Sequence, residues 1–295
     1  FAVQQLGKRP ITQFIPDAHP PPEKNGNNMK IIRFLTPEKK ISYGIYDEST
    51  PGRACAVEGD LYGDYRITRK KAQVVKLLAP LVPVNILALG VNYRKHGDET
   101  GMSYPEQPVL FLKATSSIAG HEEPLILPAA GPDCVDYEAE LAVVIGRKTK
   151  NIQPDEAEDY IMGYTCANDA SARDWQFDKQ KGQWARGKSF DTFCPLGPWI
   201  VTKDEIADPN NLKISAILNG EIVQSSNTSQ MIFNVREIVS NLSKSMTLLP
   251  GTIILTGTPE GIGFSRRPPL YLQEGDVISV EIEKIGRLTN KVIRE

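Results

Sequence analysis

The sequence lacks any apolar run long enough to cross a membrane as a helix. No segment of its 295 residues approaches the roughly 20 consecutive apolar residues that a span requires. Charge of either sign is not in excess, since 34 Lys and Arg face 36 Asp and Glu, for a formal net charge of −2. Nucleic acids and anionic membranes attract strongly basic surfaces. We therefore expect a soluble protein with no nucleic acid and no membrane as partner.

Cysteine and histidine are scarce. The four cysteines are widely spaced and form no CxxC pair or zinc-ribbon pattern. Isolated thiols are typical of reducing compartments, so cysteine usage favours a cytoplasmic location, with the mitochondrial matrix as an alternative. None of the three histidines is close in sequence to the acids Asp136, Glu138, Glu140 and Asp169, which makes a zinc site less favourable.

Three regions differ in composition. Residues 1–28 are polar and rich in Pro and Asn ("HPPPEKNGNN"), which indicates an extension, a processed segment or an expression remnant. The runs "MKIIRFL" and "KISYGIYD" predict a hairpin that opens a small β-rich N-terminal domain over 29–82. Within it, 67–81 is predicted as a short helical or linker stretch. We assign 83–295 to a second, catalytic domain.

Strand signals dominate the rest of the chain. Helices are predicted only over 154–161, 169–178 and 234–246, and no regular alternation of strands with long helices exists. We therefore expect an α+β, β-rich fold, with helices placed around the sheets. The predicted strands are 109–113, 136–145, 161–167, 198–202, 213–218, 252–256 and 277–283.

One motif is misleading. "GQWARGKS" (182–189) fits the phosphate-loop pattern, but the preceding segment is strongly polar and the following "FDTFCPLGP" contains two prolines. A phosphate loop needs a buried strand before it and a helix after it. Nucleotide binding is therefore not expected here.

Acidic residues precede a very apolar run in "VDYEAELAVVIG". Asp136, Glu138 and Glu140 alternate, so in a single strand they would share one face. Asp169 follows another predicted strand. The acids could form a solvated face of an edge strand. The apolar half of the segment favours a central strand instead, and oxygen ligands of this kind suit a hard divalent cation.

Two further segments contain candidate site residues. In "GVNYRKHGDETGM", His96 and Glu99 are three residues apart and would share one turn of a helix, where a carboxylate can orient an imidazole base. An ordinary exposed loop is the alternative. "LTGTPEGIGF" (255–264) predicts a strand followed by a loop whose amides and Thr258 hydroxyl could bind an oxyanion, or a plain turn.

Six blocks, in order, resemble the fumarylacetoacetate hydrolase family: "GVNYRKHGDE", "DYEAELAVVIG", "GYTCANDASARDWQ", "GKSFDTFCPLGPWIVT", "NGEIVQSSNTSQMIF" and "LLPGTIILTGTPEGIG". The resemblance covers about residues 84–293. It implies a mixed β-roll fold, a homodimer and a bound Mg²⁺, with Mn²⁺ or Ca²⁺ as alternatives. It places the metal ligands at Glu138, Glu140 and Asp169 and leaves Asp136 as a supporting residue.

The resemblance also implies a site and an activity. It assigns catalysis to His96, Glu99 and Lys188, and substrate binding to Arg173, Gln176 and Thr258. The implied activity is metal-dependent hydrolysis of a C–C bond in small 2-oxo acids of the acylpyruvate or fumarylpyruvate type, with an enolate leaving group and a water activated by His96 and Glu99. Alternatives on the same site are oxaloacetate decarboxylation, isomerisation of a 2-oxo diacid, and a ureidoglycolate lyase. Binding of a metal or ligand without turnover is a further alternative.

Overall fold

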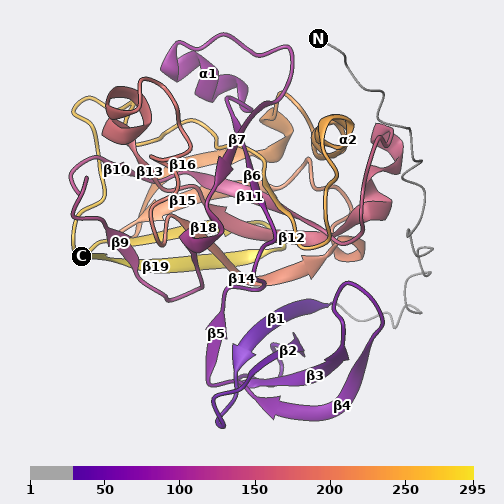
Figure 1. The fold of residues 1–295 in the computed structure, drawn as a ribbon. Helices are drawn as coiled ribbons and strands as arrows, with labels where there is room; N and C mark the ends of the chain where they lie inside the picture. The colour runs from indigo at the N-terminus through magenta and orange to yellow at the C-terminus, as the bar shows by residue number, and fades with distance from the viewer. Residues whose placement is uncertain (1–28) are drawn as a thin grey trace, which may run out of the picture.

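Strands dominate the structure, a computed structural model in which residues 29–295 are described (Figure 1). The two α-helices are α1 (Arg94–Thr100) and α2 (Val235–Ser245). Short 3-10 turns cover Thr115–Ser117, Pro154–Tyr160, Lys203–Glu205 and Thr228–Gln230, and Asp174–Lys179 is a π-helix. The β-rich α+β class is thereby confirmed. The predicted extension over 1–28 lies outside the described residues.

The strands of the first half are β1 (Lys30–Leu35), β2 (Ile41–Tyr46), β3 (Arg53–Gly59), β4 (Tyr65–Gln73), β5 (Lys76–Leu78), β6 (Ile86–Gly90), β7 (Val109–Lys113), β8 (Ile118–Ala119), β9 (Leu125–Leu127), β10 (Val135–Asp136) and β11 (Ala139–Ile145). Those of the second half are β12 (Ile161–Asn168), β13 (Ser171–Ala172), β14 (Cys194–Thr202), β15 (Lys213–Leu218), β16 (Glu221–Asn227), β17 (Ile253–Leu255), β18 (Val277–Ile282) and β19 (Gly286–Arg294).

The first five strands form a group below the main body in Figure 1. β1 and β2 pair as the predicted hairpin. The prediction of a helix or linker over 67–81 is wrong, because β4 and β5 occupy most of it. Most of the polar side chains of β4 are exposed, so its sequence does not show the apolar alternation that marks a half-buried strand. Pairing with β3, which sequence periodicity does not reveal, makes this segment a strand.

One long sheet connects this group to the rest of the molecule. Its order is β4-β3-β2-β1-β14-β12-β11-β17-β6-β7, with β5 on β1 and β8 on β14. β11 lies between β12 and β17, and all seven of its residues are buried. Side chains of a strand inside a sheet that is covered on both faces are mostly apolar, and Glu140 is the one charged exception in β11. The prediction that this segment is central is confirmed.

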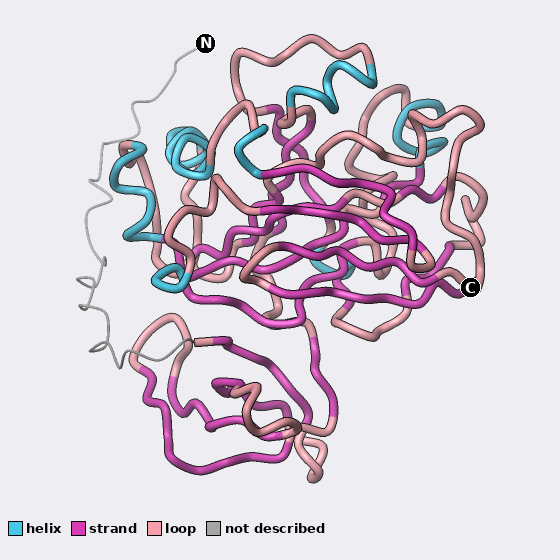
Figure 2. The backbone as a smooth tube through the Cα atoms, turned by 180° about the vertical axis from the view of Figure 1, so that it is seen from behind, coloured by secondary structure: helices cyan, strands magenta, loops and turns pink. Residues whose placement is uncertain are grey.

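A five-stranded sheet, β16-β15-β18-β19-β9, covers one face of the long sheet. The larger hydrophobic core lies between the two and includes Leu141 and Val143 of β11, Ile214 of β15 and Val280 of β18. Ala142 and Val144 point to the other face and join a second core. The layered strands and the helices at their margins are visible from behind in Figure 2.

Two predicted elements are interrupted where the site forms. The segment 136–145 is not one strand, because β10 ends at Asp136 and β11 begins at Ala139. Between them, the Glu138 N–H donates to the side chain of Asn168 instead of to a strand backbone. The helix predicted from 169 begins only at Asp174, since Ser171 and Ala172 pair with β10 as β13. The three acids therefore do not share the face of one strand.

All four cysteines are free thiols. Across residues 29–295, no helix has the length and apolar character needed to span a bilayer. The segment 182–189 leads through a turn into β14 and not into a helix, so the phosphate-loop resemblance has no structural counterpart.

Candidate metal centre and substrate cavity

Three acids from two neighbouring strands converge at one end of the long sheet. Glu138 precedes β11, Glu140 lies in it, and Asp169 follows β12. Their ligand oxygens all lie within 4.8 Å of one another, and all three residues are buried. The backbone fixes this convergence, because the Asp169 N–H donates to the Glu138 carbonyl at 2.9 Å. The structure thus brings together the three residues that the sequence predicted as ligands.

The carboxylates differ in their electrostatic surroundings. Burial opposes ionisation of Glu138, but Lys188 and Arg173 outweigh it and lower the pKa of Glu138 to about 2. Burial and the neighbouring Asp169 and Glu138 raise the pKa of Glu140 well above its usual value. Like charges in a confined site push the proton affinities of its acids apart.

Basic side chains partly neutralise this group. Lys188 Nζ lies 2.8 Å from both Glu138 Oε2 and Asp169 Oδ2. Arg173 Nη2 lies 2.7 Å from Glu138 Oε1, and the fully buried Lys113 contacts Asp169 Oδ1. Burial lowers the pKa of Lys188, but Asp169 and Glu138 outweigh that effect and raise it. These three cations hold the acids in place at close range.

The site fits a divalent cation. Glu140 Oε2 accepts a hydrogen bond from the Gly257 N–H, whereas its buried Oε1 has no partner. Such an unpartnered buried oxygen is costly unless a ligand satisfies it. With Asp136 included, four buried acids lie among three buried bases, so the site has one more acidic group than basic groups to compensate it. An oxygen set of this type suits Mg²⁺, Mn²⁺ or Ca²⁺ better than zinc.

His96 and Glu99 form the predicted pair on α1. Nδ1 of His96 lies 3.0 Å from Glu99 Oε1. Glu99 is held from a distant part of the chain, since its Oε2 accepts hydrogen bonds from the Gly261 N–H at 2.9 Å and from the Ser265 hydroxyl at 3.0 Å. Burial opposes ionisation of Glu99, but the hydrogen bonds from His96 and Gly261 outweigh it and lower its pKa. A carboxylate fixed in this way orients the imidazole.

A cavity of about 130 Å³ is lined by Glu138, one of the three acids, and by His96 of this pair. Five of the six residues predicted for catalysis or substrate binding line the cavity: His96, Arg173, Gln176, Lys188 and Thr258. The exception is Glu99. The rest of the lining is apolar and includes Phe111, Phe177 and Trp184. The Thr258 hydroxyl already donates to the Ala139 carbonyl at 3.0 Å, so toward a ligand it can act only as an acceptor.

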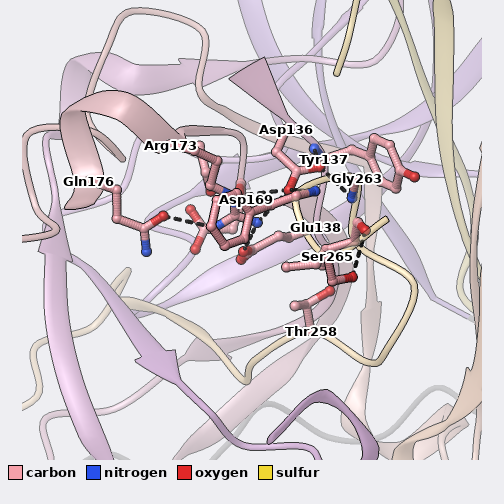
Figure 3. Close-up of polar contacts among 12 residues, drawn as sticks. Asp136, Tyr137, Glu138, Asp169, Arg173, Gln176, Thr258, Gly263 and Ser265 are labelled. Atoms are coloured by element: carbon pink, nitrogen blue, oxygen red, sulfur yellow. Dashed lines mark hydrogen bonds and ion pairs between the residues drawn. The ribbon is translucent and has the colours of Figure 1, made fainter. Parts of the chain in front are cut away.

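Asp136 supports the cavity from behind. Its carboxylate accepts hydrogen bonds from Arg173 Nε and Nη2 at 2.9 and 2.7 Å, and from the amides of Gly263 and Phe264 at 2.8 and 2.9 Å (Figure 3). Arg173 in turn donates to Gln176 Oε1 at 2.8 Å. Asp136 therefore fixes the guanidinium that faces the cavity and the loop that holds Glu99.

Sequence reasoning missed three residues of the site. Lys113 ends an apolar strand, and a single lysine there could have signalled a buried ion pair. Gln224 is buried and its side chain links the Ala139 N–H to the Thr258 hydroxyl. Ser265 contacts Glu99 across 166 positions of sequence. No local pattern in the sequence indicates the last two.

Comparison with known proteins agrees with this geometry. The family model described as fumarylacetoacetate (FAA) hydrolase C-terminal matches residues 85–293. The chain belongs to the fumarylacetoacetate hydrolase family. A Xenopus laevis protein named oxaloacetate tautomerase fahd2, mitochondrial, is 49% identical over 220 residues, which cover 74% of this chain and 69% of the relative. The fumarylacetoacetate hydrolase domain-containing protein 2 homolog of Dictyostelium discoideum is 49% identical over 226 residues, which cover 74% of each protein.

Solved structures give the same result for the fold. The crystal structure titled 5-carboxymethyl-2-hydroxymuconate delta-isomerase from Mycobacterium smegmatis has a TM-score of 0.80 and 38% sequence identity, covering 90% of this chain and 100% of that chain. The resemblance to the fumarylacetoacetate hydrolase family and its fold is confirmed, and within the family the chain is similar to the branch of domain-containing protein 2. The chain is therefore a member of an enzyme family whose named relatives include tautomerases and isomerases.

Proposed function

We propose that this family member is a Mg²⁺-dependent enzyme that interconverts the keto and enol forms of oxaloacetate or a similar small 2-oxo diacid. One observation carries the proposal: Glu138, a member of the buried acid triad suited to a divalent cation, lines the same small cavity as an imidazole base and two cationic side chains. The names of the sequence relatives support oxaloacetate as the substrate. The cavity is smaller than the roughly 300–1,000 Å³ typical of pockets for drug-sized ligands, which favours a small substrate.

In this proposal Glu138, Glu140 and Asp169 hold the cation. The cation, when bound, supplies a Lewis acid that stabilises negative charge on the keto oxygen of the substrate. Arg173 and Lys188 donate hydrogen bonds to the carboxylates of the substrate and fix its orientation in the cavity.

His96 moves the proton. With the Glu99 carboxylate as acceptor, Nδ1 of His96 carries its proton, so Nε2 is available as a base. Nε2 removes a proton from the carbon beside the keto group, the electrons of that C–H bond form the C=C bond, and the π electrons of the carbonyl move to the keto oxygen. The imidazolium then returns the proton to that oxygen, which yields the enol and restores the neutral imidazole of His96. The apolar side chains of Phe111, Phe177 and Trp184 limit the access of water to this transfer.

Hydrolysis of a C–C bond in acylpyruvate-type acids is the second candidate. The observation that favours it is the His96–Glu99 hydrogen bond, because an oriented imidazole can equally deprotonate a water molecule. Oxaloacetate decarboxylation needs no water and uses the same ligands. These reactions share the metal ligands. The base deprotonates a carbon atom in tautomerisation and a water molecule in hydrolysis, whereas loss of CO₂ requires neither step.

A substrate panel separates the candidates. Purified protein is assayed with oxaloacetate, following tautomerisation and loss of CO₂ separately, and with acylpyruvates, fumarylpyruvate and ureidoglycolate, each with Mg²⁺ and with a chelator. Glu138→Ala should abolish both Mg²⁺ binding and turnover. His96→Ala should lower turnover by about 100-fold or more while metal affinity changes little. His121→Ala is the matched control, since His121 is not among the residues that line the cavity.

The outcomes are distinct. Turnover of oxaloacetate between its keto and enol forms supports the proposal, and release of pyruvate from acylpyruvates supports the second candidate. If no 2-oxo acid in the panel is converted in the presence of Mg²⁺, the enzymatic proposal is wrong. Retained turnover in Glu138→Ala would show that the acid triad does not hold the required cation.

The cellular location and the oligomeric state of the protein are part of the proposal. The names of the sequence relatives include the word mitochondrial, so we favour the matrix over the cytoplasm for this chain. The homodimer implied by the family resemblance remains a prediction at this point.

A further inference from the structure

The loop over residues 256–265 binds carboxylates of the site through its backbone amides. Four of these N–H groups donate hydrogen bonds: that of Gly257 to Glu140, that of Gly261 to Glu99, and those of Gly263 and Phe264 to Asp136. Of these acids only Glu140 belongs to the triad, and its Oε2 accepts from Gly257 at 2.6 Å. Since Oε1 of Glu140 has no partner within residues 29–295, this single hydrogen bond orients the carboxylate.

The opposite side of the same peptide unit is held by Asn92. The carbonyl of Thr256 and the N–H of Gly257 belong to one planar trans peptide, so they point in opposite directions. Nδ2 of Asn92 donates to that carbonyl at 2.7 Å. The Asn92 side chain, the peptide and the Glu140 carboxylate therefore form one chain of hydrogen bonds, in which each bond polarises and strengthens the next.

The side chain of Asn92 cannot turn away from this contact. The residue is 1% exposed. Its Oδ1 accepts a hydrogen bond from the Phe233 N–H at 2.9 Å, and its Nδ2 also donates to the Phe233 carbonyl at 3.0 Å. A backbone N–H can only donate and a carbonyl can only accept, so these contacts determine which end of the side-chain amide is oxygen. Both N–H groups of Nδ2 are thereby used, one on Phe233 and one on Thr256.

The backbone brings Asn92 and the loop close together. Val91, which precedes Asn92, has a φ of 52°, a left-handed conformation that is unfavourable for a β-branched residue. Gly257 has a φ of 96°, and a Cβ atom there would lie 2.8 Å from the Asn92 Cβ. Backbone strain of this kind persists only where the surrounding structure imposes it, and such positions cluster at functional sites. The fold therefore imposes the close approach of Asn92 to the 256–257 peptide.

We propose that Asn92 is a positioning residue for the metal ligand Glu140, and that it acts through the 256–257 peptide. Asn92 is not among the residues that line the cavity, so it acts on neither the substrate nor the cation directly. Hydrogen bonds that orient a ligating carboxylate raise the affinity of a site for its metal. The inference rests on the proposed role of Glu140 as a ligand and is independent of the reaction that the site performs.

Asn92 also links the two halves of the candidate site. Tyr93 is the N-cap residue of α1, the helix that contains His96 and Glu99. The carbonyl of Asn92 itself accepts a hydrogen bond from the Ile232 N–H at 2.7 Å. The start of the helix with the base and the peptide that holds Glu140 are therefore fixed to the same residue.

Calorimetric titration of the metal-free full chain with Mg²⁺, without substrate, tests the proposal. Asn92→Ala should raise the dissociation constant of Mg²⁺ by about 10-fold or more. Asn290→Ala is the matched control and should leave it unchanged: Asn290 is also 1% exposed, its Nδ2 donates to the carbonyls of Gly120 and Glu123, and it does not line the cavity. Thermal melting should show a loss of stability in both variants. Unchanged Mg²⁺ binding in folded Asn92→Ala, or an equal loss of binding in both variants, would overturn the proposal.

NMR spectroscopy observes the peptide itself. Labelling with ¹³C at the Thr carbonyl and ¹⁵N in Gly selects two peptide units, Thr100–Gly101 and Thr256–Gly257, because the sequence contains no other Thr–Gly step. In metal-free protein, Asn92→Ala should move the Gly257 amide proton upfield, since its hydrogen bond to Glu140 weakens, and should leave Gly101 in place. A Gly257 signal that does not move in the folded variant would refute the role of Asn92.

The wild-type protein supplies a measurement that does not depend on the folding of a variant. Both Nδ2 protons of Asn92 should exchange slowly with solvent, because each is held in a buried hydrogen bond. Rapid exchange of either proton would contradict the proposal. A wild type that binds no Mg²⁺ would contradict the proposed metal site instead, and the Gly257 signal would still decide whether Asn92 positions Glu140.

Discussion

Asp136→Asn should destabilise the protein far more than the loss of one surface acid. The Asp136 carboxylate is fully buried and accepts four hydrogen bonds from Arg173, Gly263 and Phe264. The substitution removes the charge that compensates Arg173 and turns an amide NH₂ group toward other donors. Breaking a buried ion pair from one side costs about 3–5 kcal/mol. Urea denaturation without added metal measures the change in the free energy of unfolding.

Two comparisons make this prediction specific. Asp133→Asn, at an acid that is 82% exposed in its side chain and 3.8 Å from Arg294, should cost less than about 1 kcal/mol. The double variant Asp136→Asn with Arg173→Met should lose less than the sum of the two single variants, because the unpaired guanidinium is then gone. A loss below about 1 kcal/mol for Asp136→Asn would refute the view that Asp136 anchors Arg173 and the loop that follows β17.

Three further predictions concern the same region. The pKa of Glu99 is lowered from 4.5 in the folded protein, so the ionised carboxylate stabilises the docked α1 above pH 4.5, and this stabilisation is lost as the pH falls through the lowered pKa. Ser265→Ala removes one hydrogen bond to Glu99 and should move the loss to higher pH, which NMR titration of the Glu99 carboxyl would show. Lys113→Met should lower the melting temperature markedly without metal, because the charge of Asp169 is then left without its Lys113 partner, and much less with saturating Mg²⁺, which would compensate that charge. Equal decreases with and without Mg²⁺ would contradict the proposed metal site. Gly90→Ala should cost about 1–3 kcal/mol, because its new Cβ would lie 2.2 Å from Trp184, and a second change of Trp184→Leu should relieve the cost in a denaturation series.

The elements predicted best are those whose own sequence pattern matches their surroundings. The strands at 109–113 and 213–218 agree with the structure to the residue. The helix expected over 234–246 forms as α2, where Asn234 and Glu237 build a capping box at its start. The segment 67–81 was predicted wrongly, since its charged residues are compatible with a strand only when β3 is beside it. Local propensity is a weak guide where pairing between strands decides the structure.

By itself the sequence determined the β-rich class, the central apolar strand, and the acids and the His96–Glu99 pair that could serve as ligands and base. These are properties of residue type and spacing, and they hold wherever the segments lie. The cations Arg173 and Lys188 were expected only from the family resemblance. Spacing alone kept Asp136 among the candidate ligands, and the family resemblance removed it. The tertiary structure gives the physical reason, because the chain breaks its strand before Ala139 and pairs Asp136 with Arg173. Lys113, Gln224 and Ser265 entered the site from distant positions, because hydrogen bonds and ion pairs depend on distances in space that sequence separation does not contain.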